Sequence, residues 1–251
     1  MTTYVLVHGS TLGGWTWAPV REALERKGHR VLAPSLTGFG DRAHLAGPNT
    51  GLHLHIEDIA RLAYWEDLRD VVLVGSSYGG MVITGVAGAV PERLAHLVYL
   101  DAFRPKPGQS AFDQLPGLPE VFGDPMADKP YLWPVFTDFA QFGLSDPDQI
   151  AWLSERATPT PTATHLEPLP EPAHPANVPA TYVQGAATPF FTEVAEQARK
   201  DGLDVRIWTD SGHVPQLTHT ARVVELLEQI GGSAAGATAA RGPLSTARPR
   251  P

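Results

Sequence analysis

The sequence is distinguished first by what it lacks. No cysteine occurs among its 251 residues, which excludes disulfides, thiol catalysis and cysteine-ligated metals. The net charge is −8 at pH 7 and no basic cluster is present, so neither a nucleic acid nor an anionic membrane is an expected partner. No apolar run approaches the roughly 20 residues that span a bilayer. The N-terminus reads Met-Thr-Thr and then enters an apolar run, without a charged leader. We therefore expect a cytoplasmic protein.

Short apolar runs alternate with amphipathic segments along most of the chain. The apolar runs lie at 4–7, 31–33, 71–74, 97–100, 180–183 and 205–208. Helical patterns lie at 18–27, 54–65, 78–90, 191–200 and 220–230. Continuous apolar runs suit strands that are buried on both faces, and strands that alternate with helices imply right-handed crossovers. The predicted fold class is therefore α/β, with a doubly wound, mostly parallel sheet.

The composition changes between residues 104 and 179. Fifteen of the 24 prolines lie in this stretch, together with scattered aromatic residues. Prolines at this density prevent long helices and strands, but the aromatic side chains need burial, which favours a small cap over a disordered linker. Only 149–156 has a clear helical pattern. We predict a core of residues 1–103 and 180–232, a cap of 104–179 and a disordered tail of 233–251, which has few apolar side chains to bury.

The strand predicted at 71–74 runs directly into Gly75-Ser76-Ser77-Tyr78-Gly79. A strand that turns sharply into a helix needs small residues around the turning residue, because bulky neighbours would clash. Ser77 would occupy that turn, with a strained backbone and a hydroxyl exposed above the carboxyl end of the sheet. This pattern indicates a nucleophile elbow, and Ser77 is the candidate nucleophile.

A serine hydroxyl needs a base within hydrogen-bond reach, and His213 is the best candidate. It lies in a loop after the last strand, and such loops gather at the carboxyl edge of a doubly wound sheet. The backbone amides of Ser10 and Tyr78 are predicted to form an oxyanion hole. His8 is expected to be a structural hydrogen-bonding residue. The remaining histidines have no chemical context: His29, His44, His53, His55, His96, His165, His174 and His219.

Several motifs together resemble a known family. They are Val-His-Gly-x-x-x-Gly-Gly-Trp-x-Trp at 7–17, Thr-Gly-x-Gly-x-Arg-Ala-His-Leu at 37–45, Gly-x-Ser-Tyr-Gly-Gly-Met-Val-Ile at 75–83, Leu-Val-Tyr-Leu-Asp-Ala-Phe at 97–103, and Gly212-His213. They resemble the esterase and hydroxynitrile-lyase branch of the α/β-hydrolase superfamily, which includes plant methyl esterases and bacterial pyrethroid-type carboxylesterases. The resemblance covers about residues 3 to 230 and implies the α/β-hydrolase fold, with the order serine, acid, histidine along the chain.

The acid is where the chain departs from that family. The resemblance places the acid after the strand that precedes the penultimate helix, but the loop here, 185–189, contains no carboxylate. Other members of the superfamily place the acid after the preceding strand, and Asp101 fits that location. Asp101 is therefore the preferred orienting acid, with Glu193 or no acid as the alternatives. Family lyases have a threonine and a lysine where this chain has Gly9 and Val214, so lyase activity is not expected.

These features predict a serine hydrolase that cleaves a carboxylic ester or lactone through an acyl-enzyme. Gly9, Trp15 and Trp133 are the expected substrate-binding residues, and the aromatic cap implies a rather apolar, small to medium substrate. No cofactor is expected, and no histidine and carboxylate cluster has metal-ligand spacing; His53 and His55 are expected on the surface. Two alternatives stay open: a non-hydrolytic cyclisation, elimination or rearrangement in natural-product tailoring, and a non-catalytic ligand receptor.

Overall fold

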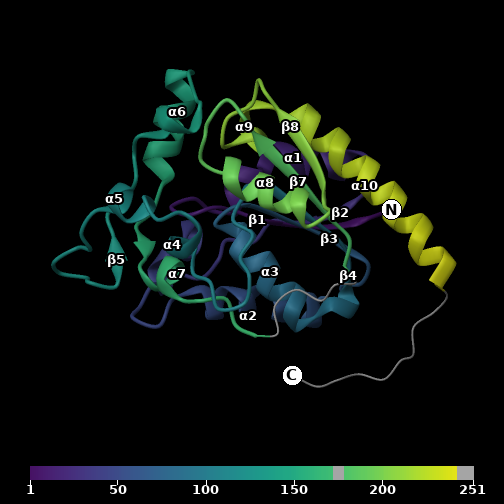
Figure 1. The fold of residues 1–251 in the computed structure, drawn as a ribbon, viewed down its shortest axis with the longest axis horizontal. Coiled ribbons are helices and arrows are strands. Elements are labelled where there is room, and N and C mark those ends of the chain that lie inside the picture. The colour runs from purple at the N-terminus through teal and green to yellow at the C-terminus, as the bar shows by residue number, and fades with distance from the viewer. Residues whose placement is uncertain (172–177, 242–251) are drawn as a thin grey trace.

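The computed structural model describes residues 1–171 and 178–241, and its centre is a six-stranded sheet (Figure 1). The strand order is β2-β1-β3-β4-β7-β8, and all five strand pairings are parallel. The strands are β2 (Arg30–Leu32), β1 (Thr3–Val7), β3 (Val71–Ser77), β4 (Leu94–Ala102), β7 (Ala180–Gly185) and β8 (Asp204–Trp208). The predicted doubly wound parallel sheet is confirmed.

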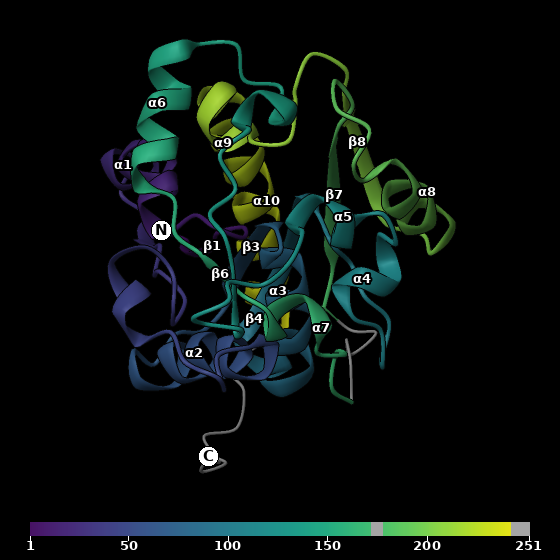
Figure 2. The same ribbon diagram turned by 90° about the vertical axis from the view of Figure 1, so that its left-hand side faces the viewer.

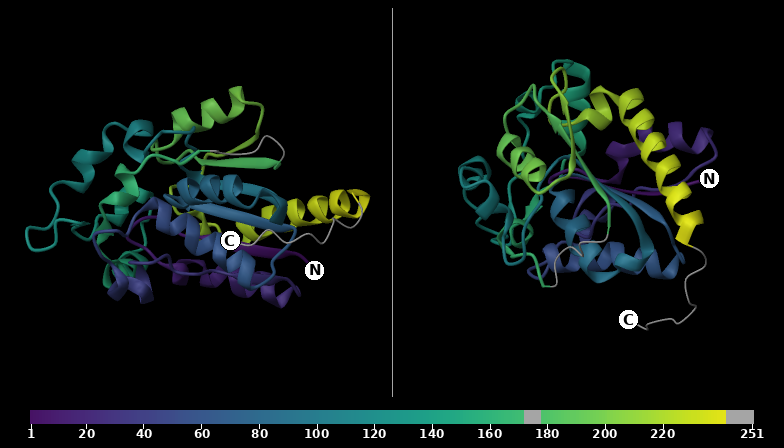
Figure 3. Two further views of the ribbon diagram at one scale, coloured as in Figure 1. Left: turned by 90° about the horizontal axis from the view of Figure 1, so that it is seen from below. Right: turned by 45° about the vertical axis from the view of Figure 1, so that its right-hand side comes forward.

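Helices cover both faces of this sheet (Figure 3). On one face lie α1 (Ala18–Arg26) and α10 (Thr220–Arg241), and on the other lie α2 (Leu52–Trp65), α3 (Gly79–Ala89) and α8 (Thr192–Lys200). Side chains alternate along each strand, so that Leu6 of β1 packs with α1 and α10 while its neighbours Val5 and Val7 pack with α2 and α3. Burial on both faces explains why the strands read as continuous apolar runs.

The last helix is longer than the sequence predicted. Helix α10 continues from Thr220 to Arg241, so the prediction of disorder is wrong for 233–241. Residues 242–251 of the predicted tail lie outside the described residues. Residues 233–241 are rich in alanine, which has the highest helix propensity of all residues. No helix in 1–171 or 178–241 has the length and apolar character that a membrane crossing requires.

The predicted cap region, here called the insert (104–179, of which 172–177 are not described), lies at the carboxyl ends of the strands (Figure 2). Its elements are short, as its prolines predict. They are α4 (Ala111–Gln114), α5 (Leu118–Phe122), β5 (Leu132–Trp133), η4 (Phe139–Phe142), α6 (Pro147–Arg156), β6 (Thr160–Pro161) and α7 (Ala163–Leu166). Part of the insert packs on the core through a cluster that joins Phe139 and Leu153 to Leu12 and Val214.

Candidate active site

Ser77 lies at the end of β3, in the sharp turn that leads into α3. Its backbone has φ 53°, the left-handed region that a residue other than glycine rarely adopts. The turn brings backbone segments very close together: a Cβ at Gly75 would collide with the carbonyl of Gly79, and one at Gly80 with that of Phe103. This close approach explains the small residues of the motif. The strained turn is the predicted elbow, and it presents Ser77 to a cavity above the sheet.

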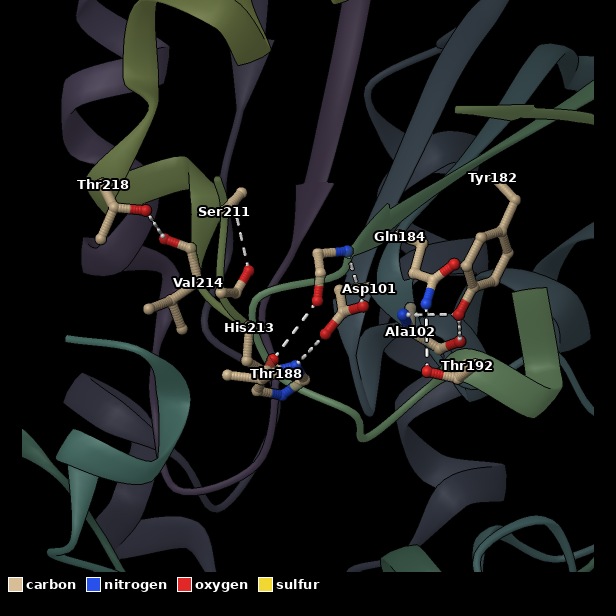
Figure 4. Close-up of polar contacts among 12 residues, drawn as sticks. Asp101, Ala102, Tyr182, Gln184, Thr188, Thr192, Ser211, His213, Val214 and Thr218 are labelled. Atoms are coloured by element: carbon tan, nitrogen blue, oxygen red, sulfur yellow. Dashed lines mark hydrogen bonds and ion pairs between the residues drawn. The ribbon is translucent and has the colours of Figure 1, made fainter. Parts of the chain in front are cut away.

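Asp101, in β4, and His213, in the loop between β8 and α9 (Pro215–Thr218), come together above the sheet (Figure 4). His213 Nδ1 donates to Asp101 Oδ2 over 2.7 Å, and the Gly185 amide donates to the other carboxylate oxygen over 3.0 Å. Asp101 is fully buried, and its backbone has φ 44°. Because Nδ1 carries the proton that faces the carboxylate, Nε2 of the neutral ring is left with a lone pair.

A tyrosine holds the end of the strand that carries the acid. The Tyr182 hydroxyl donates to the carbonyl of Ala102 over 2.7 Å and accepts from its amide over 3.2 Å, as Figure 4 shows. Strand β7 is thereby joined to the residue after Asp101. Burial and the nearby Asp101 carboxylate raise the pKa of Tyr182 well above its usual value, so the hydroxyl stays a proton donor. The alternative acid Glu193 lies in the first turn of α8, whereas the His213 contact is made by Asp101.

A single cavity of about 370 Å³ is lined by both Ser77 and His213. Its wall comes from the loop after β1, from α4, α5 and η4 of the insert, and from the loop before α8. Most of this wall is apolar. The predicted Gly9 and Ser10 lie in the wall, and a Cβ at Gly9 would be only 2.8 Å from that of Ser77. Gly9 therefore lets the loop lie directly against the nucleophile candidate.

The two predicted tryptophans do not line this cavity, and here the prediction of substrate contact is not supported. Trp15 packs edge-to-face on Trp152, with ring centroids 4.7 Å apart. Trp133 is buried behind Phe122, at 4.7 Å between centroids, and it is Phe122 that faces the cavity. The sequence shows that an aromatic residue of the insert needs burial, but it does not show which ring of a stacked pair is in front.

The predicted oxyanion-hole donors are the amides of Ser10, which lies in the cavity wall, and of Tyr78, which directly follows Ser77 in the chain. Within the described residues, no hydrogen bond uses either amide as a donor. The Tyr78 side chain points away from Ser77 into the core, where its hydroxyl donates to His55 Nδ1 over 2.9 Å. The other nitrogen of His55 donates to the Thr37 carbonyl over 2.7 Å. The expectation that His55 is a surface residue is therefore wrong, whereas His53 is exposed.

His8, next to Gly9 in the chain, is also buried. His8 donates from Nδ1 to the Gly9 carbonyl over 2.7 Å and accepts the Leu36 amide over 3.0 Å, which confirms its predicted structural role. Burial lowers the pKa of His8, like that of His55, to about 4, so both rings are neutral at pH 7. The described residues contain no group of three or more side chains that could hold a metal ion.

Comparison with known proteins adds to this geometry. A family model described as "Alpha/beta hydrolase family" matches residues 4–226, which is most of the chain. The chain belongs to the alpha/beta hydrolase family.

Relatives of this α/β hydrolase include several esterases. A carbendazim hydrolyzing esterase of Nocardioides sp. (strain SG-4G) is 42% identical over 188 residues, which are 67% of this chain and 73% of the relative. Methylesterase 1 of Arabidopsis thaliana is 32% identical over 142 residues, 56% of this chain and 51% of the relative. The hydrolase is thus an enzyme of the esterase type.

Solved structures show the same fold at low identity. An extracellular α/β-hydrolase from a Paenibacillus species has a TM-score of 0.75 at 23% identity, and the match covers 92% of this chain and 99% of the Paenibacillus chain. Tomato methylketone synthase I, complexed with 2-tridecanone, has a TM-score of 0.79 at 17% identity, and the match covers 93% of this chain and 98% of the synthase.

Sequence reasoning gave no role to most residues that line the cavity of the hydrolase, and His165 is the polar one with the most contacts to the predicted site. His165, in α7 of the insert, is buried, and its Nε2 lies 3.1 Å from Ser10 Oγ. Nothing in the sequence around it, Thr162-Ala163-Thr164-His165, indicates chemistry. A contact across 155 residues is set by how the insert folds over β1, which no local pattern encodes.

Proposed function

We propose that this α/β hydrolase is a serine esterase in which Ser77 is the nucleophile, His213 the general base and Asp101 the orienting acid. The observation that carries the proposal is the 2.7 Å contact between His213 Nδ1 and Asp101 Oδ2, in a ring that shares one cavity with Ser77. A buried carboxylate on Nδ1 fixes the tautomer in which Nε2 can accept a proton.

In the first half of the proposed reaction, Ser77 Oγ attacks the carbonyl carbon of the ester while its proton passes to His213 Nε2. The carbonyl oxygen becomes an oxyanion that the amides of Ser10 and Tyr78 stabilise. Loss of one such donor typically reduces the rate by about 10² to 10³. The C–O bond to the alcohol then breaks, and the alcohol leaves with the proton from His213. Ser77 is left as an acyl ester.

In the second half, His213 takes a proton from water, and the resulting hydroxide attacks the acyl carbon. Ser77 Oγ leaves, recovers the proton from His213, and the carboxylic acid departs. No cofactor enters this scheme, since every proton and electron pair is supplied by the three side chains, the ester and water. The rings of Phe142, Phe190 and Phe191 lie 4.8, 5.4 and 5.4 Å from that of His213 and shield it from bulk water.

The proposed substrate is a small to medium, rather apolar carboxylic ester or lactone. The largely apolar wall and the volume of about 370 Å³ support this class, because binding sites for small molecules commonly span roughly 300 to 1,000 Å³. Carbendazim, which the name of the Nocardioides relative identifies as its substrate, is a reasonable compound to test alongside simple esters.

A non-hydrolytic reaction on the same fold was suggested by the absence of a carboxylate at 185–189. The absence of that carboxylate is a weaker argument for non-hydrolytic chemistry because another carboxylate, that of Asp101, contacts His213. A receptor that only bound its ligand would have no need of the buried Asp101 carboxylate on His213, so this contact also disfavours the receptor alternative. One experiment distinguishes the serine esterase from both alternatives.

The experiment combines turnover of a p-nitrophenyl ester with labelling by a fluorophosphonate probe, in the wild type and in Ser77→Ala. We expect labelling and turnover in the wild type and loss of both in the variant. Ser76→Ala is the matched control, since the adjacent serine lies in β3 before the turn. Labelling without turnover would support a non-hydrolytic reaction, and absence of labelling in the wild type would refute the nucleophile assignment.

A further inference from the structure

The loop after β1 is held in an unfavourable conformation. Thr11, directly after Ser10, has φ 61°, although its branched Cβ makes this region costly. Backbone in such a region persists only where surrounding contacts fix it. The contacts that fix this loop decide where the Ser10 amide points, and that amide is one of the two donors in the proposed oxyanion hole.

Those contacts come from the insert. Thr11 Oγ1 donates to the Thr158 carbonyl over 2.7 Å, and the Thr158 amide donates back to the Thr11 carbonyl over 2.8 Å. The hydroxyl of Ser10 contacts His165 Nε2 over 3.1 Å. A further bond runs from Thr158 Oγ1 to the Thr11 carbonyl at 3.5 Å, so four hydrogen bonds join two neighbouring residues of the loop to residues 158–165 of the insert. On the core side of the loop, the Gly9 carbonyl accepts a hydrogen bond from His8 Nδ1.

The hydrogen-bond network fixes the direction of the Ser10 contact. The Thr164 hydroxyl donates its one proton to the Pro161 carbonyl, so its oxygen can only accept from His165 Nδ1, at 2.7 Å. His165 is consequently protonated on Nδ1 and unprotonated on Nε2, and the Ser10 hydroxyl is the donor to it. Burial lowers the pKa of His165 to about 3, which agrees with a neutral ring.

The same ring also contacts the second residue of the oxyanion hole. His165 stacks on the ring of Tyr78 with centroids 5.2 Å apart and planes at 28°. On its other sides it is packed by Phe122 at 4.7 Å and Phe112 at 5.7 Å. One buried histidine of the insert thus touches both residues of the proposed oxyanion hole.

We propose that His165 is a positioning residue for the oxyanion hole: through the Ser10 hydroxyl it holds the loop after β1 so that the Ser10 amide faces the carbonyl oxygen on Ser77. The inference rests on the proposed function, in which that amide is an oxyanion donor. It assigns the insert a part in transition-state stabilisation in addition to closing the cavity. A histidine that only packed the insert on the core would affect stability, and one that bound the substrate would affect KM.

The test uses four variants and a matched control. His165→Leu removes the acceptor, His165→Gln keeps an acceptor atom at the same end of the side chain, Ser10→Ala removes the hydroxyl but keeps the amide, and the double variant combines Ser10→Ala with His165→Leu. His96→Leu is the control, because His96 Nε2 also contacts a threonine hydroxyl, Thr181 at 2.9 Å, but in the strands below the site. Each protein is assayed for kcat and KM with a p-nitrophenyl ester.

We expect kcat to fall about tenfold or more in His165→Leu and Ser10→Ala, with KM changed less than about twofold, since full loss of a donor reduces the rate by about 10² to 10³. The double variant should lose little beyond either single change, because both act through one contact. His165→Gln should recover part of kcat. The inhibition constant of an alkyl trifluoromethyl ketone, whose adduct with Ser77 is a tetrahedral oxyanion, should rise by the same factor as kcat/KM falls.

A second measurement does not depend on turnover. Amide hydrogen exchange of the peptide that contains residues 9–12 should accelerate in His165→Leu and Ser10→Ala but not in His96→Leu. Unchanged exchange, an effect confined to KM, equal kinetics of His165→Gln and His165→Leu, or an equal loss in His96→Leu would each overturn the inference. Failure of the proposed function is a different result, namely turnover that survives Ser77→Ala.

Discussion

Replacement of Asp101 by asparagine tests the most consequential contact of the site. Asp101 accepts two hydrogen bonds, from His213 Nδ1 at 2.7 Å and from the Gly185 amide at 3.0 Å, and its side chain is fully buried. An asparagine has one acceptor and one donor end. The Gly185 amide can only donate, so the asparagine oxygen must face it and the asparagine NH₂ must face His213.

This arrangement would reverse the tautomer of the base. With an NH₂ donor on Nδ1, the neutral ring of His213 carries its proton on Nε2 and can no longer accept the proton of Ser77. In serine hydrolases with this arrangement, the same change reduces kcat by about 10⁴. At about 1.36 kcal/mol for each factor of ten, the loss corresponds to about 5 kcal/mol of transition-state stabilisation.

The assay is kcat for a p-nitrophenyl ester near pH 7.5, with the thermal unfolding midpoint measured in parallel to confirm that the variant folds. Glu193→Gln is the control, because Glu193 was the alternative acid and it borders the same cavity. We expect Asp101→Asn to lose about 10⁴ in kcat and Glu193→Gln to lose less than about tenfold. If Asp101→Asn retained more than a tenth of the activity, or if Glu193→Gln lost as much, the assignment of the acid would be refuted.

Two further predictions follow from other features of the site. Gly9→Ala should reduce kcat and slow fluorophosphonate labelling by about tenfold or more. The new Cβ would be 2.8 Å from the Cβ of Ser77, so either the nucleophile or the loop would have to move. Gly47→Ala is the control and should have no effect, because no atom lies within 4 Å of a Cβ at that position. Burial lowers the pKa of His8 and of His55 from 6.5 to about 4. The unfolded chain therefore binds more protons between these values, and the free energy of unfolding should fall as pH is lowered from about 6.5 to about 4, as measured by urea titration. A constant free energy over that interval would contradict the burial of neutral histidines.

The sequence was sufficient for the sheet, because both faces are covered and its strands read as continuous apolar runs between helical patterns. It was also sufficient for the elbow, since the collision that a side chain would cause at Gly75 is with the carbonyl of Gly79, within the turn itself. It was insufficient for the end of α10. The stretch after residue 232 has little to bury, and the absence of apolar side chains suggested disorder although the helix continues to Arg241.

Residues that meet across long stretches of chain were harder to predict. The sequence placed Asp101 at the end of a strand but left it open against Glu193 or no acid, because the choice depends on the distance to His213, 112 residues away. It placed Trp15 and Trp133 at the cavity, where the structure has Phe122 in front of Trp133. It gave His165 no role, and His55 a surface position, although both rings are buried beside Tyr78.

The succession of strands and helices along the chain and the tight turn at Ser77 were therefore determined by the sequence itself, through apolar periodicity and local sterics. Only the tertiary structure decided which carboxylate contacts His213, which aromatic ring lines the cavity and which part of the insert contacts the loop of Ser10. These choices depend on how a proline-rich segment of short elements packs over the carboxyl edge of the sheet. That packing is set by contacts between residues distant in sequence, which hydrophobic patterns and turn preferences do not encode.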